Sequence, residues 1–282
     1  MNKRKSIKEL NLLDKFLFDE AMDDPENVKT MLDIILSQNT NLKQSPQTEK
    51  EQRTSTDNRQ IRLDVYAIDE DDVIYEVEAQ KENTHNLPKR SRLYQGIIDS
   101  KLLPPGVVDF NLLNEVLIVL IMPFDLFGYG LYRYTFQMKC QEIPELKLDD
   151  GATRIFLNTK GKHPESVSPE LIELLKYMEH STDEVSEACE SKRIQEMHRR
   201  VCQIRASEKT EVKYMQSWEE RIMIKQEGIA EGRIEGEKAL LKSLIEKKMA
   251  KKYSAEQISA MLEVDVSEVE NIMKEIQNEK YL

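Results

Sequence analysis

The chain has few of the residues that mark several common protein classes. Its 282 residues include only three cysteines, Cys140, Cys189 and Cys202, with one tryptophan and nine residues each of glycine and proline. Cysteines that are odd in number and widely spaced predict neither a disulfide framework nor a zinc site. The longest apolar run, Val116 to Met122, is far too short to span a bilayer and predicts a buried central strand.

The start of the chain, MNKRKSIKEL, is basic but lacks the apolar segment of a secretory signal. With the short apolar runs, this predicts a cytoplasmic protein that has no membrane partner. Apolar residues make up 39% of the chain, which is enough to build a core. A length of 282 residues predicts one large domain and a smaller one.

Negative charge is concentrated in the front part of the chain. Residues 190–282 hold 18 Lys plus Arg and 18 Asp plus Glu, so the other 23 basic and 34 acidic residues place the net charge of −11 in residues 1–189. Such a domain does not attract DNA by bulk charge. Phosphate binding then requires a bound metal and clustered bases such as Lys89, Arg90 and Arg92.

The most informative stretch is IRLDVYAIDEDDVIYEVEAQ, which begins at residue 61. Two segments rich in Val, Ile and Tyr, Ile61 to Ile68 and Val73 to Gln80, flank an acidic turn, as in a β-hairpin. Because side chains alternate along a strand, Glu76, Glu78 and Gln80 share one face. We expect the opposite face of this strand to lie in the core.

The register of the hairpin decides what its carboxylates do. A loop of residues 69–73 places Asp64 opposite Glu78, with Cβ atoms within about 5.5 Å, where a hard cation can bridge them. A two- or four-residue loop instead places Asp64 opposite Val77 and turns its carboxylate toward the core, at a high cost. A further alternative is an ordinary amphipathic hairpin whose glutamates face water.

Asp64 followed fourteen positions later by Glu78-x-Gln80 resembles the PD-(D/E)XK nuclease signature, with Gln80 in the lysine position. Seven segments together resemble the Rpn family of recombination-promoting nucleases, also known as PD-(D/E)XK nuclease family transposases, over residues 6–180. They are LLDKFLF, RLDVYA, YEVEAQ, PKRSRLYQGIID, FDLF, YTF and FLNTKG, in this order along the chain. Two features depart from the family pattern: Ala79 replaces a larger apolar residue, and residues 41–60 are polar where the fold needs a first strand.

The resemblance implies an α/β fold with a PD-(D/E)XK restriction-endonuclease-like core, a mixed central sheet flanked by helices, and an all-helical C-terminal extension. It implies a metal-dependent DNA endonuclease with Asp64, Glu78 and Gln80 as catalytic residues. Asp64 and Glu78 are then the ligands of Mg²⁺ or another divalent cation. Arg92 and Tyr94, with Arg90 beside them, are the candidates for positioning the substrate, and Asp14 in LLDKFLF is a candidate supporting acid.

Gln80 cannot carry the positive charge of a lysine or act as a general base, so we expect slower chemistry. A second metal ion or Lys81 could supply the positive charge that Gln80 lacks, although strand alternation turns Lys81 to the opposite face. The alternative function is a catalytically weak or inactive family member that binds DNA or mediates assembly.

Three helices are predicted around the hairpin, at 6–23, at 25–36 and, beginning near Pro88, at 90–102. The nuclease-like domain is predicted to end at residue 182. A helical segment comes next, at 183–252, in which Gly228, Gly232 and Gly236 recur every four residues. This spacing indicates close helix contact, in a homo-oligomer or within the chain, or else a flexible joint.

Residues 253–282 are predicted to form a small helix-turn-helix-like module. Two capping boxes are expected, from Ser254 to Gln257 and from Ser267 to Glu270. The second helix is acidic, which favours packing or assembly over reading of a DNA groove. The basic run at 242–252 offers sequence-independent phosphate contacts or forms a solvated helix face.

Overall fold

The structure, a computed structural model, describes residues 5–52 and 61–279. Residues 1–4 of the basic N-terminus and residues 53–60 of the polar segment lie outside the described part. The chain forms two compact units, Met1–Tyr214 and Met215–Leu282. No helix among the described residues is both long and apolar enough to cross a bilayer.

The first unit is built on a six-stranded mixed sheet with the order β1-β2-β3-β4-β6-β5. Its strands are β1 (Gln47–Gln52), β2 (Ile61–Ile68), β3 (Ile74–Ala79), β4 (Val116–Met122), β5 (Arg133–Phe136) and β6 (Ala152–Asn158). Strands β3, β4 and β6 are parallel, and the other neighbours are antiparallel. The predicted apolar run forms the buried central strand β4.

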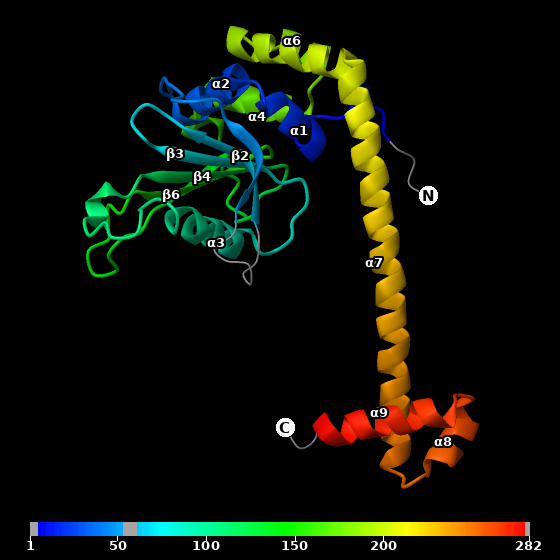
Figure 1. The fold of residues 1–282 in the computed structure, drawn as a ribbon. Helices are drawn as coiled ribbons and strands as arrows, with labels where there is room; N and C mark the ends of the chain where they lie inside the picture. Colours follow the sequence, from blue (N-terminus) through cyan, green and yellow to red (C-terminus); the bar gives the residue numbers. More distant parts are fainter. Residues whose placement is uncertain (1–4, 53–60, 280–282) are drawn as a thin grey trace. The chain divides into compact units, whose positions relative to one another are not determined.

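Helices cover both faces of this sheet (Figure 1). One face carries α1 (Lys15–Met22), α2 (Pro25–Leu36), α4 (Pro169–Glu179) and α6 (Lys192–Ala206), with the short α5 (Asp183–Glu187) between the last two. The other face carries α3 (Leu87–Asp99). Helix α2 has the predicted bounds, and the predicted α/β fold, a mixed sheet flanked by helices with a helical C-terminal region, is confirmed.

The first predicted helix is shorter than expected. A 3-10 turn, η1 (Ile7–Glu9), is closed by a capping box in which the backbone N–H of Ser6 donates to Glu9 at 2.7 Å. The chain then becomes irregular, and the backbone N–H of Asn11 donates to the Asp14 carboxylate at 3.0 Å. Helix α1 therefore begins at Lys15, with Asp14 at the N-cap position.

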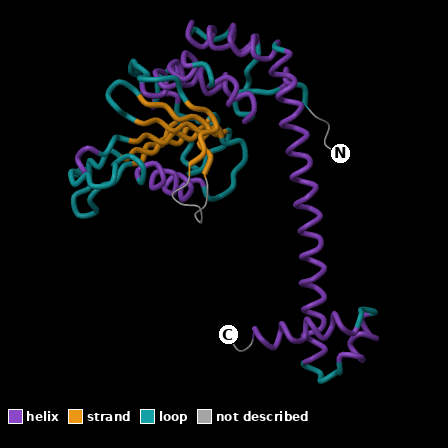
Figure 2. The backbone as a smooth tube through the Cα atoms, in the orientation of Figure 1, coloured by secondary structure: helices purple, strands orange, loops and turns teal. Residues whose placement is uncertain are grey.

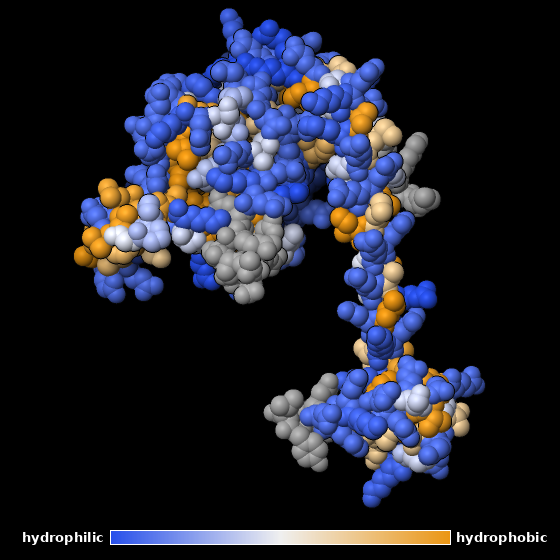
Figure 3. Space-filling view, viewed as in Figure 1, coloured by the Kyte–Doolittle hydropathy of each residue, from blue (hydrophilic) through white to orange (hydrophobic). Residues whose placement is uncertain are grey.

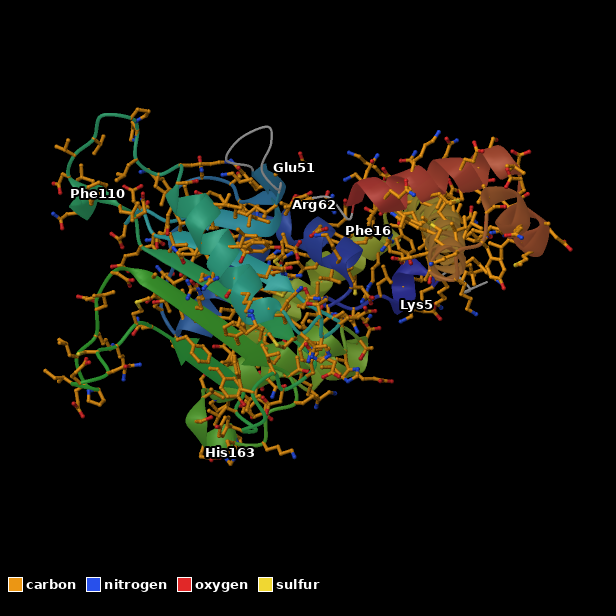
Figure 4. The ribbon with its side chains drawn as sticks, turned by 90° about the horizontal axis from the view of Figure 1, so that it is seen from below. Lys5, Phe16, Glu51, Arg62, Phe110 and His163 are labelled. Carbon is orange, nitrogen blue, oxygen red and sulfur yellow. The ribbon has the colours of Figure 1, made fainter. Side chains whose placement is uncertain are left out.

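The first unit extends beyond the expected boundary at residue 182. Ile194, Met197 and Val201 of α6 are fully buried in the same core as α1 and α2. Tyr214 packs on Phe16 with ring centroids 5.0 Å apart and donates its hydroxyl to the Lys5 carbonyl at 3.1 Å (Figure 4 labels both partners). These contacts attach the start of α7 (Glu208–Met249) to the sheet unit.

The second unit is entirely helical outside its turns (Figure 2). After α7 come α8 (Ala255–Leu262) and α9 (Val266–Glu279), around a small core of Ile245, Ile258, Val269 and Ile276. The capping box from Ser254 to Gln257 is confirmed. The second predicted box is wrong, because α9 begins at Val266 and Asp265 accepts the backbone N–H of Ser267 at 2.8 Å.

Apolar side chains are exposed on two loops of the first unit, before β4 and between β5 and β6. The loop before β4, which includes η2 (Phe110–Leu112), exposes Val108 and Phe110, and the second loop exposes Ile143 and Leu148. Orange atoms gather on this part of the unit in Figure 3, and Figure 4 labels Phe110 there. A short turn after β6, η3 (Pro164–Ser166), completes the elements.

Candidate metal centre

The predicted register of the hairpin is confirmed. Ile68 pairs with Ile74 and Val65 with Val77, so residues 69–73 form the loop, and the same register continued one residue beyond the last pair sets Asp64 opposite Glu78. Asp69 holds the loop closed, because its carboxylate accepts the backbone N–H of Val73 at 2.9 Å and the hydroxyl of Tyr75 at 2.6 Å. The alternative loops, which turn Asp64 to the core, are wrong.

The pairing of β2 with β1 is interrupted at Asp64. Thr48 pairs with Val65 and Lys50 with Leu63, but the intervening residue, Glu49, has a positive φ of 50° and no ladder partner. A non-glycine residue in this region is strained by about 1–3 kcal/mol, and such strain is concentrated at functional sites. The distortion lies directly across from a predicted metal ligand.

The carboxylates are buried rather than solvated. Asp64 is 5% exposed, Glu78 is 7% exposed and Glu76 is fully buried, with α1 supplying Lys15 beside Asp64 and α3 supplying Arg90 beside Glu78. The alternative of an amphipathic hairpin with glutamates in water is therefore wrong. Burying ionisable groups is costly unless cations, protons or metals compensate them.

Two cations from different elements compensate the predicted ligands. The ammonium of Lys15, the first residue of α1, forms an ion pair with Asp64 and lies 3.2 Å from Asp19. The guanidinium of Arg90, on α3, donates to the carboxylate of Glu78 and to the side-chain oxygen of Gln80. Arg90 also lies over the ring of Tyr94, 5.7 Å from its centroid.

Burial dominates the proton affinities in this cluster. Burial raises the pKa of Glu78 to about 7, while Arg90 lowers it and Asp64 raises it. The pKa of Glu76 lies well above its usual value, because of burial and of the neighbouring carboxylates of Glu78 and Asp64. Burial lowers the pKa of Lys15, but Asp64 and Asp19 outweigh this effect and hold it above the usual value, so Lys15 stays charged.

Three buried carboxylate oxygens lack a hydrogen-bond partner within the described part of the chain. They are Oε2 of Glu78 and both oxygens of Glu76. Buried polar atoms are normally satisfied, so orphaned oxygens at one site require an explanation. Carboxylate oxygens are the ligands that Mg²⁺ and similar hard cations prefer. The donor set of Asp64 and Glu78 therefore fits a divalent cation.

The remaining predicted residues divide into two groups. Arg90 and Tyr94 lie against the carboxylates, whereas Arg92 is exposed and its guanidinium forms no hydrogen bond with another described residue. Asp14 forms an ion pair with Lys81 and accepts the backbone N–H of Asn11. Strand alternation failed to predict this contact of Lys81, since β3 ends at Ala79.

Two residues at the site received no role from the sequence. Lys15 stands next to Asp14 within LLDKFLF, and only the break in the first helix turns it toward Asp64. Glu76 lies two residues before Glu78, so alternation does place it on the ligand face. The sequence signal for Glu76 was therefore its position on the same strand face as Glu78, where a charged side chain is unusual if helices cover that face.

A mixed six-stranded sheet flanked by helices is consistent with the fold of the PD-(D/E)XK nuclease class. A sequence profile of the PD-(D/E)XK nuclease family transposases matches residues 15–227, and the chain belongs to this family. Searches of curated proteins and of solved structures found no match. Family membership supports a nuclease-type function.

Proposed function

We propose that the chain is a divalent-metal-dependent DNA endonuclease that hydrolyses phosphodiester bonds, with Asp64 and Glu78 as the ligands of Mg²⁺ or a similar cation. The observation that carries the proposal is the hairpin register, which sets these two buried carboxylates side by side. The unpartnered Oε2 of Glu78 supports it, because a cation at this position would satisfy that oxygen. A bound cation supplies an activated water and stabilises negative charge on the phosphate.

Lys15 takes over the charge that Gln80 cannot supply. A lysine in the Gln80 position would come from β3, whereas Lys15 reaches Asp64 from α1 and keeps its proton. In a buried site a fixed positive charge stabilises developing negative charge more strongly than in water. We therefore assign to Lys15 the stabilisation of the phosphate in the transition state.

Gln80 positions Arg90 in this proposal. Its side-chain oxygen accepts from Arg90, while its amide nitrogen donates to the Glu82 carbonyl at 2.9 Å. The amide is thereby held at both ends. Arg90, stacked on Tyr94, then presents its remaining donors to a phosphate oxygen, which matches the fork geometry of guanidinium–phosphate pairs.

One observation favours the second candidate function, a weak or inactive family member that binds DNA or mediates assembly. Asp64 and Glu78 each already have a cation, Lys15 and Arg90, so the charge of the site is compensated without a metal. Under the endonuclease proposal these pairs loosen when the metal binds and release both cations toward DNA. Under the second function they persist.

The test compares Asp64→Asn with a matched control, Asp71→Asn, which removes an exposed carboxylate from the loop of the same hairpin. Mn²⁺ binding is followed by electron paramagnetic resonance, and cleavage of supercoiled plasmid is followed on gels. We expect Asp64→Asn to lose both Mn²⁺ binding at this site and cleavage, and Asp71→Asn to retain both. Equal cleavage by Asp64→Asn and the parent rejects the proposal.

DNA recombination is the process that this activity would serve, and a cytoplasmic location remains a prediction.

We also propose a homo-oligomer formed through α7, on which Gly228, Gly232 and Gly236 lie in open space. A Cβ added at any of the three meets no atom within 4 Å. Within the described part of the C-terminal unit no other element therefore packs against these glycines, which supports a role in contact with a second copy or as a joint.

A further inference from the structure

Three side chains of metal-binding type meet between α5 and α6. Asp183 is the first residue of α5, and His198 and Cys202 lie one turn apart on α6. The Asp183 carboxylate oxygen, His198 Nε2 and Cys202 Sγ all lie within 4.8 Å of one another. This cluster uses neither the residues nor the elements of the carboxylate site on the sheet.

The separations are close to those of a tetrahedral coordination shell. His198 Nε2 lies 2.7 Å from Asp183 Oδ1, and Cys202 Sγ lies 3.4 Å from His198 Nε2 and 4.0 Å from Asp183 Oδ1. Zinc bonds of about 2.0–2.3 Å at tetrahedral angles set ligand atoms roughly 3.3–3.6 Å apart. A movement of the Asp183 carboxylate by about half an ångström would change the observed separations into those of a tetrahedral zinc site. The Asp183 side chain is 83% exposed and therefore free to make it.

The histidine is oriented for this role. His198 is 7% exposed, and its Nδ1 lies 3.0 Å from the hydroxyl of the buried Tyr177. Metal-binding histidines commonly use the second ring nitrogen for such an outer hydrogen bond, which fixes the ring and its tautomer. A bound ion would select the tautomer in which Nδ1 donates to the Tyr177 hydroxyl and the Nε2 lone pair binds the metal, whereas without an ion the 2.7 Å contact with Asp183 is a hydrogen bond from Nε2–H.

We propose that Asp183, His198 and Cys202 bind a transition-metal ion of the Zn²⁺ type, with a water molecule in the fourth position. Thiolate and imidazole ligands select this class of metal over Mg²⁺, which takes oxygen ligands. A hydrogen bond between Asp183 and His198 explains two of the three residues without a metal. The Cys202 thiol stands beside His198 because the two residues lie one helical turn apart, and Asp183 arrives from a second helix to complete a set of three ligands.

The bound ion joins α5 to α6 and thus braces the helical layer that packs on the sheet. The spacing of the cysteines alone does not reveal this site. The usable signal is His198 one helical turn before Cys202, which sets both side chains on one face of α6. Asp183 comes from a separate helix, and only the fold brings it to the pair.

The test uses the full chain, treated with reductant and chelator, transferred to chelator-free buffer and titrated with Co²⁺ as a spectroscopic substitute for Zn²⁺. A cysteine thiolate bound to Co²⁺ gives a charge-transfer band in the near ultraviolet that oxygen ligands do not give. We expect the parent to show this band, Zn²⁺ to abolish it by competition, and an excess of Mg²⁺ to leave it unchanged. Zn²⁺ should also raise the melting temperature.

Variants identify the ligands. Cys202→Ser should lose the band, whereas the double variant Cys140→Ser/Cys189→Ser, which keeps Cys202 as its one thiol, should retain it. Asp183→Asn removes an exposed ligand without disturbing the fold and should weaken binding at least as much as loss of an outer-shell partner, about 10–100-fold.

Glu78→Gln, at the sheet site, should leave the cobalt band unchanged, so this proposal and the proposed nuclease function fail independently. A parent without the charge-transfer band, or a band of equal intensity in Cys202→Ser, overturns the proposal. Equal affinity in Asp183→Asn and the parent overturns the assignment of Asp183.

Discussion

At the scale of single residues, burial of carboxylates is what gives the sheet site its chemistry. Glu76 has no exposed surface and neither of its oxygens has a partner among the described residues. Its neighbour Glu78 shares Arg90 with Gln80. The protein therefore maintains a proton on Glu76 at a pH at which a solvated glutamate would have lost it.

This proton makes stability depend on pH. The native state keeps the Glu76 proton above pH 4.5, the usual pKa, whereas the unfolded chain loses it. The free energy of unfolding therefore falls as pH rises from 4.5 through the folded pKa, by up to about 1.4 kcal/mol per pH unit for one proton. We expect Glu76→Gln, measured by urea unfolding in EDTA, to make this decline shallower. The exposed Glu82→Gln should keep the parent's pH dependence, and an unchanged decline in Glu76→Gln contradicts the expectation.

The second prediction at this scale concerns the two lysines near the carboxylates. Lys15 pairs with Asp64 and Lys81 with Asp14. We expect Lys15→Met to slow plasmid cleavage on the order of 100-fold or more, the usual loss for one charge-stabilising donor, and Lys15→Arg to recover part of it. Lys81→Met, which leaves Asp64 untouched, should have the smaller effect. A larger loss in Lys81→Met would transfer the compensating role to Lys81.

At the scale of elements, periodicity and turn chemistry determine which parts of the fold the sequence predicts. The bounds of β2 and α2 and the buried β4 agree with the structure, because β-branched residues, a proline at the start of the helix and a continuous apolar run mark them. The register of the hairpin is the alternative that keeps the carboxylate of Asp64 out of the core. Strand β1, QTEKEQ, could not be recognised by an apolar pattern. It lies at the edge of the sheet and pairs only with β2, so its side chains need not be apolar.

The features of the site that the sequence did not predict depend on contacts between residues that are far apart in the chain. The break after η1 that turns Lys15 to Asp64 depends partly on Ser181, whose hydroxyl accepts the backbone N–H of Leu12 at 3.0 Å. No local pattern around residue 12 encodes that partner. The same limit applies to Asp183, which reaches His198 across the turn between two helices.

Helix α7 provides the prediction at the scale of elements. Gly228, Gly232 and Gly236 are accompanied by exposed apolar side chains, among them Ile224 and Ile229, which a second copy of the helix would bury. Replacing the three glycines with alanine should add about 1 kcal/mol of helix stability per site, because these positions are open in one chain.

We expect the same triple variant to weaken the homo-oligomer, because added Cβ atoms separate two closely packed backbones. Sedimentation equilibrium of the parent, the triple variant and Gln226→Ala, on a different face of α7, measures this effect. A flexible joint instead predicts equal masses for all three proteins, with only an increase in helicity for the triple variant.

At the scale of the whole molecule, charge limits how DNA can bind. The net charge of −11 resides in residues 1–189, which contain the sheet site. A phosphate backbone approaching this region is repelled unless a cation reverses the local charge. We expect Ca²⁺, added in place of EDTA, to tighten DNA binding measured by fluorescence anisotropy. Glu78→Gln should respond less than the parent, and equal binding in EDTA and Ca²⁺ contradicts a role for the cation in DNA binding.

The most direct measurement is the rate of plasmid cleavage by the parent and by Glu78→Gln in Mg²⁺, Mn²⁺ or Ca²⁺, with Glu82→Gln as the matched control. Glu78→Gln keeps the size of a side chain that borders Arg90 and removes only its charge. Metal-dependent cleavage by the parent and by Glu82→Gln, with loss of cleavage in Glu78→Gln, is the expected result. Cleavage by Glu78→Gln at the parent's rate, or no cleavage by the parent in any of the three ions, would contradict a metal-dependent nuclease built on Asp64 and Glu78.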